Sequence, residues 1–288
     1  MRIQRLAGPV LAQLWDRRAR GQLLRSFKHG ELRARAERFI ERIGPLGDGA
    51  EGSHPASGEP ASDLRALFEG NLQGPGIWKW IHYFAAYEEH LGRYRGKCPV
   101  VAEIGVFSGG SLRMWRDWFG PGAQIHGIDI DPACRSYESL GVTIHIGDQG
   151  DLGFWDGFRR AVPRLDVLID DGGHLPEQQA TTLEKVLPHL APGGTLIIED
   201  VHGDNNAFTS YMEVLVTKLH AQRQRPDGTV ELSHFQASVE QITFLPYMAV
   251  LRKRRFPAPS FGAERRGTEW QPARVVDSVG RLIHGRGA

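Results

Sequence analysis

The sequence has few cysteines, little net charge and no long apolar run. Its 288 residues contain two cysteines, Cys98 and Cys134, too few for a disulfide framework, so we interpret them as reduced thiols of a cytoplasmic protein. A formal net charge of +1 gives no electrostatic reason to expect nucleic-acid binding. No apolar stretch could span a bilayer. Asp16 and many arginines interrupt the N-terminal apolar stretch, which argues against a signal peptide.

The first 45 residues differ from the rest in charge. They hold ten arginines and one lysine against four acids, and Leu11, Leu14 and Trp15 belong to an interrupted helical pattern of apolar residues. We expect helices that dock on the main domain or on another copy of the chain in a homo-oligomer, with peripheral membrane contact as the alternative. The predicted parts are a helical appendage with a linker over 1–62, a main domain over 63–255 and an extended tail over 256–288.

A strand, a glycine-rich turn and a helix follow one another early in the main domain. Residues 101–110 read VAEIGVFSGG, and the helical apolar pattern begins directly after them. Glycines have no Cβ, so a ligand can approach the backbone N–H groups of such a turn. A phosphate loop would need Lys where Ser111 stands, and Val106 and Phe107 break the dinucleotide-binding pattern. ATP and NAD are therefore disfavoured.

Acidic residues follow four further predicted strands. The strands and their acids are 124–131 with Asp129, 142–146 with Asp148, 165–169 with Asp170 and Asp171, and 195–198 with Glu199 and Asp200. Asp129 stands where the ribose hydroxyls of a nucleoside could donate to it. Any one of these acids could cap the next helix, but the series indicates the binding edge of a parallel α/β sheet.

Two of these strand ends carry enough negative charge to require a cation. Four carboxylates, those of Asp170, Asp171, Glu199 and Asp200, meet if the two strands are adjacent and parallel. Hard oxygen ligands without nearby cysteine favour Mg²⁺ or Mn²⁺ over Zn²⁺. The alternative is that one carboxylate caps a helix while an arginine neutralises another.

Three motifs carry a resemblance to known enzymes. Residues 103–109 resemble the E-x-G-x-x-x-G motif of class I methyltransferases. The motifs DDGGH at 170–174 and EDVH at 199–202 resemble, more narrowly, the Mg²⁺-dependent sugar O-methyltransferases of the macrocin, mycinamicin and cephalosporin hydroxylase family, which usually has Ser in place of Gly173. The similarity covers roughly residues 76–255. It implies a Rossmann-like α/β fold with a mostly parallel seven-stranded sheet flanked by helices.

The resemblance also implies a role for each matching position. The cofactor would be S-adenosylmethionine, and the metal Mg²⁺ or Mn²⁺. The implied cofactor-binding residues are Glu103, Gly105, Phe107, Ser108, Gly109, Asp129, Asp148, Gln149 and Asp170. The implied metal ligands are Asp171, Glu199 and Asp200, with His174 as general base. His202, in the second motif, is a further candidate for a substrate contact or a second base. Lys79, before the first strand, could meet the cofactor carboxylate.

These roles predict O-methylation of a small-molecule or glycan hydroxyl. The expected acceptor is a sugar in a secondary metabolite, glycolipid or polysaccharide. A metal ion would lower the pKa of its hydroxyl, and an imidazole would remove the proton. A catechol-like diol is the competing acceptor because its two oxygens also chelate Mg²⁺. A non-catalytic cofactor-binding partner is the alternative of a different class.

Overall fold

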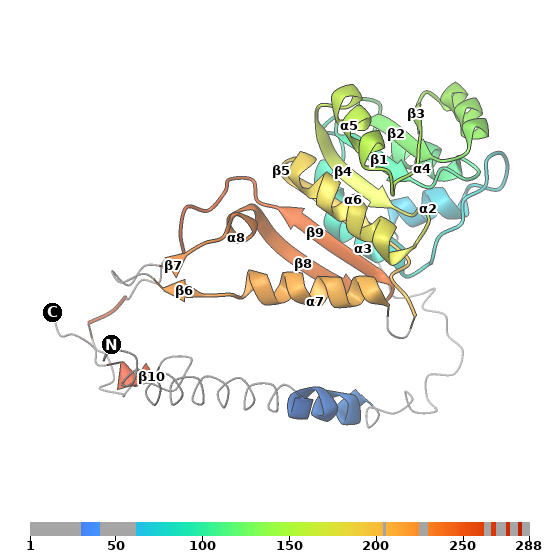
Figure 1. Cartoon of the computed structure of the whole chain (residues 1–288). Helices are drawn as coiled ribbons and strands as arrows, with labels where there is room; N and C mark the ends of the chain where they lie inside the picture. The colour runs from blue at the N-terminus through green and yellow to red at the C-terminus, as the bar shows by residue number, and fades with distance from the viewer. Residues whose placement is uncertain are drawn as a thin grey trace, which may run out of the picture. The chain divides into compact units, whose positions relative to one another are not determined.

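The computed structural model describes residues 30–40, 62–203, 206–224, 230–261, 266–268, 275–276 and 282–283. The chain divides into two compact units, Met1–Glu59 and Pro60–Ala288. In the first unit, residues 30–40 are helical and mostly exposed (Figure 1). The remainder of the predicted appendage and linker, up to residue 61, lies outside the described residues. Within the described part, no helix has the length and apolar character needed to cross a membrane.

A seven-stranded sheet forms the centre of the second unit, in the order β3-β2-β1-β4-β5-β9-β8. The parallel strands are β1 (Val100–Ile104), β2 (Gln124–Asp129), β3 (Thr143–Ile146), β4 (Leu165–Asp170) and β5 (Leu190–Ile198). The antiparallel strand β9 (Met248–Lys253) pairs with β5 and with β8 (Val239–Leu245). The predicted mostly parallel seven-stranded sheet is confirmed. Its order reverses between β1 and β4, where open α/β sheets bind ligands.

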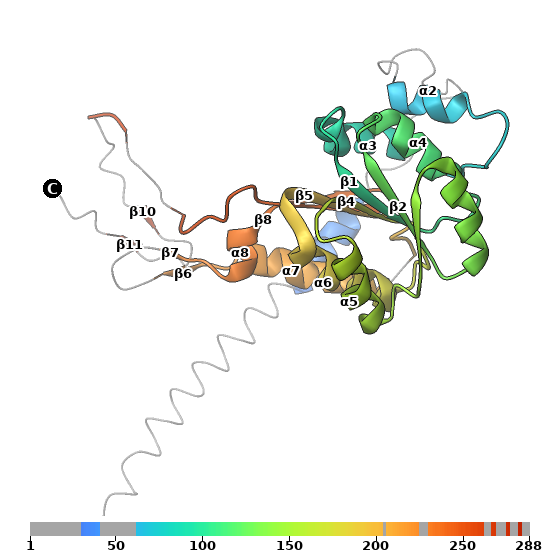
Figure 2. The ribbon, with the colours of Figure 1, turned by 90° about the horizontal axis from the view of Figure 1, so that it is seen from above.

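Helices cover both faces of this sheet (Figures 1 and 2). The first face carries α2 (Asp63–Glu69), α3 (Tyr83–Leu91), α4 (Gly110–Phe119) and the 3₁₀ segment η3 (Pro132–Leu140). The second carries α5 (Leu152–Ala161), α6 (Pro176–His189) and α7 (Ala207–Leu219). β1 and β4 are buried along their whole length, because both faces of a parallel sheet lie under helices. This explains their unbroken apolar composition.

The C-terminal part departs from the sequence prediction. Residues 230–237 and 239–251 both have strand-like composition, which predicts that they form an antiparallel pair. In the first run, however, only β7 (Val230–Glu231) is extended, and it pairs with β6 (Arg223–Gln224). Ser233 and Gln236 form a capping box, in which each side chain accepts from the other's backbone N–H, and this begins helix α8 (His234–Ser238). The closing antiparallel pair comes entirely from the run after it. A turn at Pro246 and Tyr247 divides that run into β8 and β9.

The remaining elements are short. The 3₁₀ segment η2 (Gly92–Tyr94) follows α3, and in the tail β10 (Val275–Val276) pairs with β11 (Leu282–Ile283).

Candidate functional site

A cavity of about 860 Å³ lies at the C-terminal ends of the parallel strands. Six of the predicted cofactor-binding residues line it: Gly105, Phe107, Ser108, Asp129, Asp148 and Gln149. The predicted metal ligands and both candidate bases also line it: Asp171, Glu199, Asp200, His174 and His202. Glu103, Gly109 and Asp170 are not part of its lining. The topology therefore brings to one cavity residues that lie up to about a hundred positions apart in the sequence.

The turn after β1 is built so that only glycine fits at its first position. Gly105 has φ +90°, and a Cβ there would overlap the backbone carbonyl oxygen of Asp171. Its N–H donates to the carbonyl of Ile128 at 2.9 Å. Phe107 also has positive φ, at +48°, and its side chain is 74% exposed. The turn thus lies tightly against the end of β4 and offers an exposed aromatic face.

Asp129, at the end of β2, fixes the shape of this turn. One oxygen of its carboxylate accepts the N–H groups of Val106 at 2.9 Å and Phe107 at 3.1 Å. The other accepts the N–H of Asp131 at 2.9 Å. Because a carboxylate oxygen can accept more than one hydrogen bond, Asp129 can still meet a ligand hydroxyl where it lines the cavity.

Asp170 and Gln149 stabilise the turn after β4 through hydrogen bonds. Asp170 is 1% exposed, and the Gln149 amide donates to its two oxygens at 2.9 and 3.1 Å. The Gln149 carbonyl oxygen in turn accepts the N–H of Gly173 at 2.8 Å. Burial raises the pKa of Asp170 to about 6, although these hydrogen bonds oppose the rise. Asp170 therefore supports the turn that carries Asp171 and His174.

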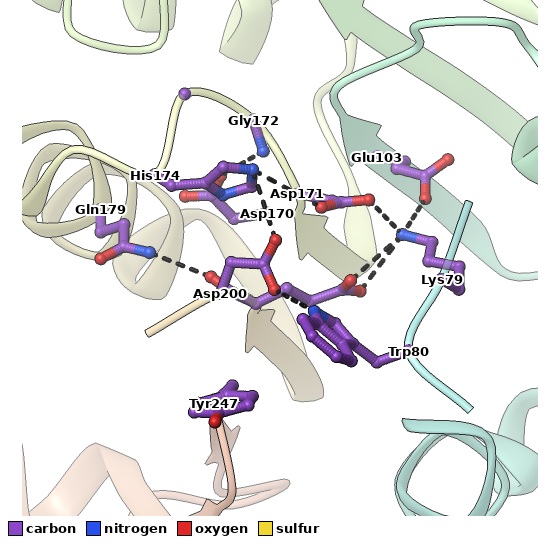
Figure 3. Close-up of polar contacts among 12 residues, drawn as sticks. Lys79, Trp80, Glu103, Asp170, Asp171, Gly172, His174, Gln179, Asp200 and Tyr247 are labelled. Carbon is purple, nitrogen blue, oxygen red and sulfur yellow. Dashed lines mark hydrogen bonds and ion pairs between the residues drawn. The ribbon is translucent and has the colours of Figure 1, made fainter. Parts of the chain in front are cut away.

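Asp171, His174 and Asp200 come together from the ends of β4 and β5. One ligand atom from each lies within 4.8 Å of the others. The Nε2 atom of His174 is 3.9 Å from Oδ1 of Asp171 and 3.5 Å from Oδ2 of Asp200 (Figure 3). The opposite oxygens accept from Lys79 at 2.6 Å and from the Trp80 indole at 2.9 Å. Each acid thus keeps one oxygen facing the imidazole.

Unusual backbone geometry gathers at this cavity. Among the described residues, five other than glycine have positive φ. Three of them, Phe107, His174 and Asp200, line the cavity, and a fourth, Tyr247, packs its ring against Trp80. Such conformations cost about 1–3 kcal/mol each and persist only where the surrounding structure enforces them. The strained positions include His174 and Asp200, two of the three members of the acid and imidazole cluster.

Lys79 lies within the acidic cluster. Its side chain is 2% exposed, and its ammonium is 2.6 Å from Asp171, 3.0 Å from Glu103 and 3.2 Å from Glu199. Burial lowers the pKa of Lys79, but the carboxylates of Glu103 and Glu199 outweigh that effect and leave the pKa raised. A contact with the cofactor carboxylate, expected from the sequence, is not what this geometry favours, because three protein carboxylates already surround the ammonium.

Glu199 lies deeper than the other two predicted metal ligands. It is 1% exposed, and the Tyr87 hydroxyl donates to it at 2.6 Å. Burial raises the pKa of Glu199 to about 8, against the opposing charge of Lys79. Its carboxylate is outside the group that faces His174. The predicted ligands therefore sit on neighbouring strand ends, as expected, with Lys79 against one side of Asp171 and Glu199.

The acid cluster suits a hard divalent cation. Asp171, Glu199 and Glu103 place three carboxylates around the single ammonium of Lys79. Asp200 adds a fourth carboxylate beside them, held by the Trp80 indole. Buried negative charge in excess of its partners is costly, and oxygen donors are the ligands that Mg²⁺ and Mn²⁺ prefer. In addition, the buried Nδ1 of His174 has no hydrogen-bond partner among the described residues.

Several residues of the site have little signal in the sequence. The run of aromatic residues from Trp78 to Phe84 predicts a packed segment. It does not predict that the Trp80 indole donates a hydrogen bond to Asp200. Tyr247 stands in an apolar run expected to be one strand, so no pattern predicts that it reaches the end of β5. These contacts depend on tertiary structure.

Comparison with protein families identifies the central domain. A family model described as "Methyltransferase domain" matches residues 102–201, the span that holds the glycine turn, the four acidic strand ends and His174. This part of the chain is therefore similar to a methyltransferase domain.

Curated relatives of this chain are named O-methyltransferases. It is 30% identical over 197 residues to 8-demethyl-8-alpha-L-rhamnosyl tetracenomycin-C 2'-O-methyltransferase of Streptomyces olivaceus, covering 61% of this chain and 52% of the relative. It is 38% identical over 130 residues to mycinamicin VI 2''-O-methyltransferase of Micromonospora griseorubida, covering 42% and 32%. The chain thus spans about half or less of the length of these relatives.

A solved structure agrees with these relatives. MycE methyltransferase from the mycinamycin biosynthetic pathway, in complex with Mg and SAH, is 26% identical, with a TM-score of 0.55 over 67% of this chain and 54% of that one. The second unit therefore has the fold of a methyltransferase crystallised with Mg and SAH, and the predicted Rossmann-like methyltransferase fold is confirmed.

Proposed function

We propose that the protein is a divalent-metal-dependent O-methyltransferase that uses S-adenosylmethionine and acts on a sugar hydroxyl of a natural product or glycan. The observation that carries this proposal is the convergence of Asp171, His174 and Asp200 on one cavity with the glycine turn. The relatives' names support the acceptor class, and the MycE complex supports the cofactor and metal.

The glycine turn and the ends of β2 and β3 form the cofactor half of the cavity. Gly105 would let the ligand approach the backbone, Asp129 would offer carboxylate oxygens to the ribose hydroxyls, and Asp148, which lines the cavity, would contact the adenine. Phe107 provides an exposed apolar surface beside them. Glu103, Gly109 and Asp170 lie outside the lining, and Asp170 supports the turn that carries Asp171 and His174.

The other half of the cavity holds the groups for chemistry. Asp171 and Asp200, each with one oxygen facing His174, would hold a divalent cation together with Glu199, the third predicted ligand. S-Adenosylmethionine supplies the methyl group, and Mg²⁺ supplies positive charge that lowers the pKa of the acceptor hydroxyl. Nε2 of His174 takes the hydroxyl proton while the oxygen–methyl bond forms and the sulfur–methyl bond breaks. His202 lies at the same end as a substrate contact or second base.

The test is calorimetric titration with S-adenosylmethionine, with and without Mg²⁺, followed by transfer of a labelled methyl group to methyl α-L-rhamnopyranoside or to catechol. We expect cofactor binding in both conditions and transfer to the pyranoside only with metal. Absence of cofactor binding would reject the proposal. If methyl transfer were equally fast with Mg²⁺ and with a chelator, the role of the metal would be rejected. Transfer to catechol alone would favour the hypothesis of a catechol-like diol acceptor.

Three sequence predictions beyond the site stay predictions. They are the cytoplasmic location, the homo-oligomer or membrane contact of the arginine-rich segment, and the domain boundaries at residues 62 and 255.

A further inference from the structure

Four aromatic rings gather at the end of the cavity that holds His174. Trp80 and His202 line the cavity, and the Tyr247 ring lies 5.6 Å from Trp80 and 5.7 Å from His202. His82 completes the group, 5.9 Å from Trp80. Trp80 remains 49% exposed and Tyr247 43% exposed. We call Trp80, His202 and Tyr247 the aromatic wall. Large rings that are half open to solvent beside a cavity offer surface to a ligand.

The aromatic wall is held in place by polar contacts. The Trp80 indole donates to Asp200, and the backbone carbonyl of Tyr247 accepts from the Tyr83 hydroxyl and from the N–H of Val201, each at 2.9 Å. Tyr247 has φ +61°, a conformation that is unfavourable for a residue with a large side chain. The turn between β8 and β9 therefore keeps a strained tyrosine in order to place its ring beside the end of β5.

The wall lies directly beside the reacting groups. The indole contacts Oδ1 of Asp200, while Oδ2 of the same carboxylate faces His174 at 3.5 Å (Figure 3). A ring that rests on Trp80 would thus extend a substituent toward Asp200 and His174. The glycine turn and Asp129 stand at the other half of the cavity and leave this half to the acceptor.

The geometry points to the aromatic wall as the acceptor subsite, which binds a pyranose ring by its C–H face and so directs one hydroxyl to His174. The inference rests on the proposed function and adds the residues that recognise the sugar. Aromatic rings carry negative charge on their faces, which attracts the polarised C–H groups of a sugar ring. Trp80 and Tyr247 set which ring is accepted, whereas His174 and the acids carry the reaction.

Two substitutions of Tyr247 test the role of its ring without changing the backbone conformation. Asn and His both tolerate positive φ better than other residues, so Tyr247→Asn removes the ring and Tyr247→His keeps an aromatic one in the same backbone. We expect Tyr247→Asn to raise the KM for methyl α-L-rhamnopyranoside roughly two- to tenfold, in line with the strength of single aromatic contacts. The value of kcat and the Kd for S-adenosylmethionine should not change, and Tyr247→His should stay near the wild type.

A binding measurement separates this inference from the proposed function. Saturation-transfer NMR on the full chain, with S-adenosylhomocysteine and Mg²⁺, should show protein contact to the pyranoside ring protons, and Tyr247→Asn should weaken it. That result supports the subsite even if no methyl transfer is found. Unchanged KM and NMR contact in Tyr247→Asn, or no pyranoside contact in the wild type, would overturn the subsite and leave the methyltransferase proposal intact.

Discussion

Lys79 donates to Oδ2 of Asp171 at 2.6 Å and thereby turns Oδ1, the other oxygen of that carboxylate, toward His174. The same ammonium contacts Glu103 and Glu199. One buried positive charge thus serves three acids. It decides which oxygens of the cluster are neutralised from within the protein and which remain available to a cation.

Replacing this lysine should reduce stability strongly. In Lys79→Met, three carboxylates lose the ammonium that contacts them, and breaking a buried ion pair from one side costs about 3–5 kcal/mol. Urea unfolding measured without divalent metal should show a loss of this order. Lys97→Met, at an exposed lysine, is the matched control and should change little. A loss below about 1 kcal/mol in Lys79→Met would contradict the ion-pair account.

Replacing Gly105 by Ala should disturb both the fold and the cofactor site. Its Cβ would overlap the carbonyl of Asp171 at φ +90°, so we expect at least about 1–3 kcal/mol of destabilisation and loss of S-adenosylmethionine binding by calorimetry. At Gly157, inside α5, an added Cβ would meet no neighbouring atom of the described residues within 4 Å. Gly157→Ala should therefore be neutral or stabilising by up to about 1 kcal/mol. Equal effects in the two variants would argue against a special turn.

His174→Asn should abolish proton removal without altering the backbone, because Asn tolerates positive φ. We expect methyl transfer to fall by about 10²–10⁴-fold while the Kd for S-adenosylmethionine stays unchanged. His202→Asn is the comparison and should affect acceptor KM more than kcat. Wild-type turnover in His174→Asn would show that another group acts as the general base.

Asp200→Asn should weaken metal binding. One of its oxygens is held by Trp80, and the change neutralises the oxygen that faces His174. Electron paramagnetic resonance of Mn²⁺ should show at least about tenfold weaker binding, the effect of roughly 1.4 kcal/mol. Asp117→Asn, at an exposed acid in α4, should bind like the wild type. Identical Mn²⁺ titrations for the two variants would exclude Asp200 as a ligand.

Asp170 should make stability fall as pH rises. Burial raises its folded-state pKa to about 6 from an ordinary value of 3.8, so between these values the folded protein binds more protons than the unfolded chain. The contribution is fully present below about 3.8 and is lost as pH rises through about 6. In urea unfolding, Asp170→Asn should remove this part of the decline between pH 4 and 7. An unchanged pH slope would refute the shift.

The sequence was most informative where one short segment determines its own structure. The glycine pattern around Gly105 requires a turn that a Cβ would block, and the strand ends at Asp129, Asp170 and Glu199 lie where the apolar runs stop. These are local properties of the chain. The parallel arrangement then places all the strand ends on one edge. The sequence therefore predicts which residues belong to the candidate site, although it does not predict the contacts between them.

Prediction failed where the pattern was ambiguous. Residues 230–237 have strand-like composition, yet Ser233 and Gln236 satisfy each other's backbone groups and begin a helix. The same composition suits a strand or a short capped helix, and only the surrounding contacts decide between them.

The edge that binds and the identity of its acids follow from this sequence alone, because they depend on residue type and on short-range periodicity. The order of the strands and the distribution of charge within the acid cluster were decided only by the tertiary structure. Lys79 is 92 residues from Asp171 and Trp80 is 120 residues from Asp200. No local rule links positions so distant, since such contacts form only when the sheet and its helices pack together.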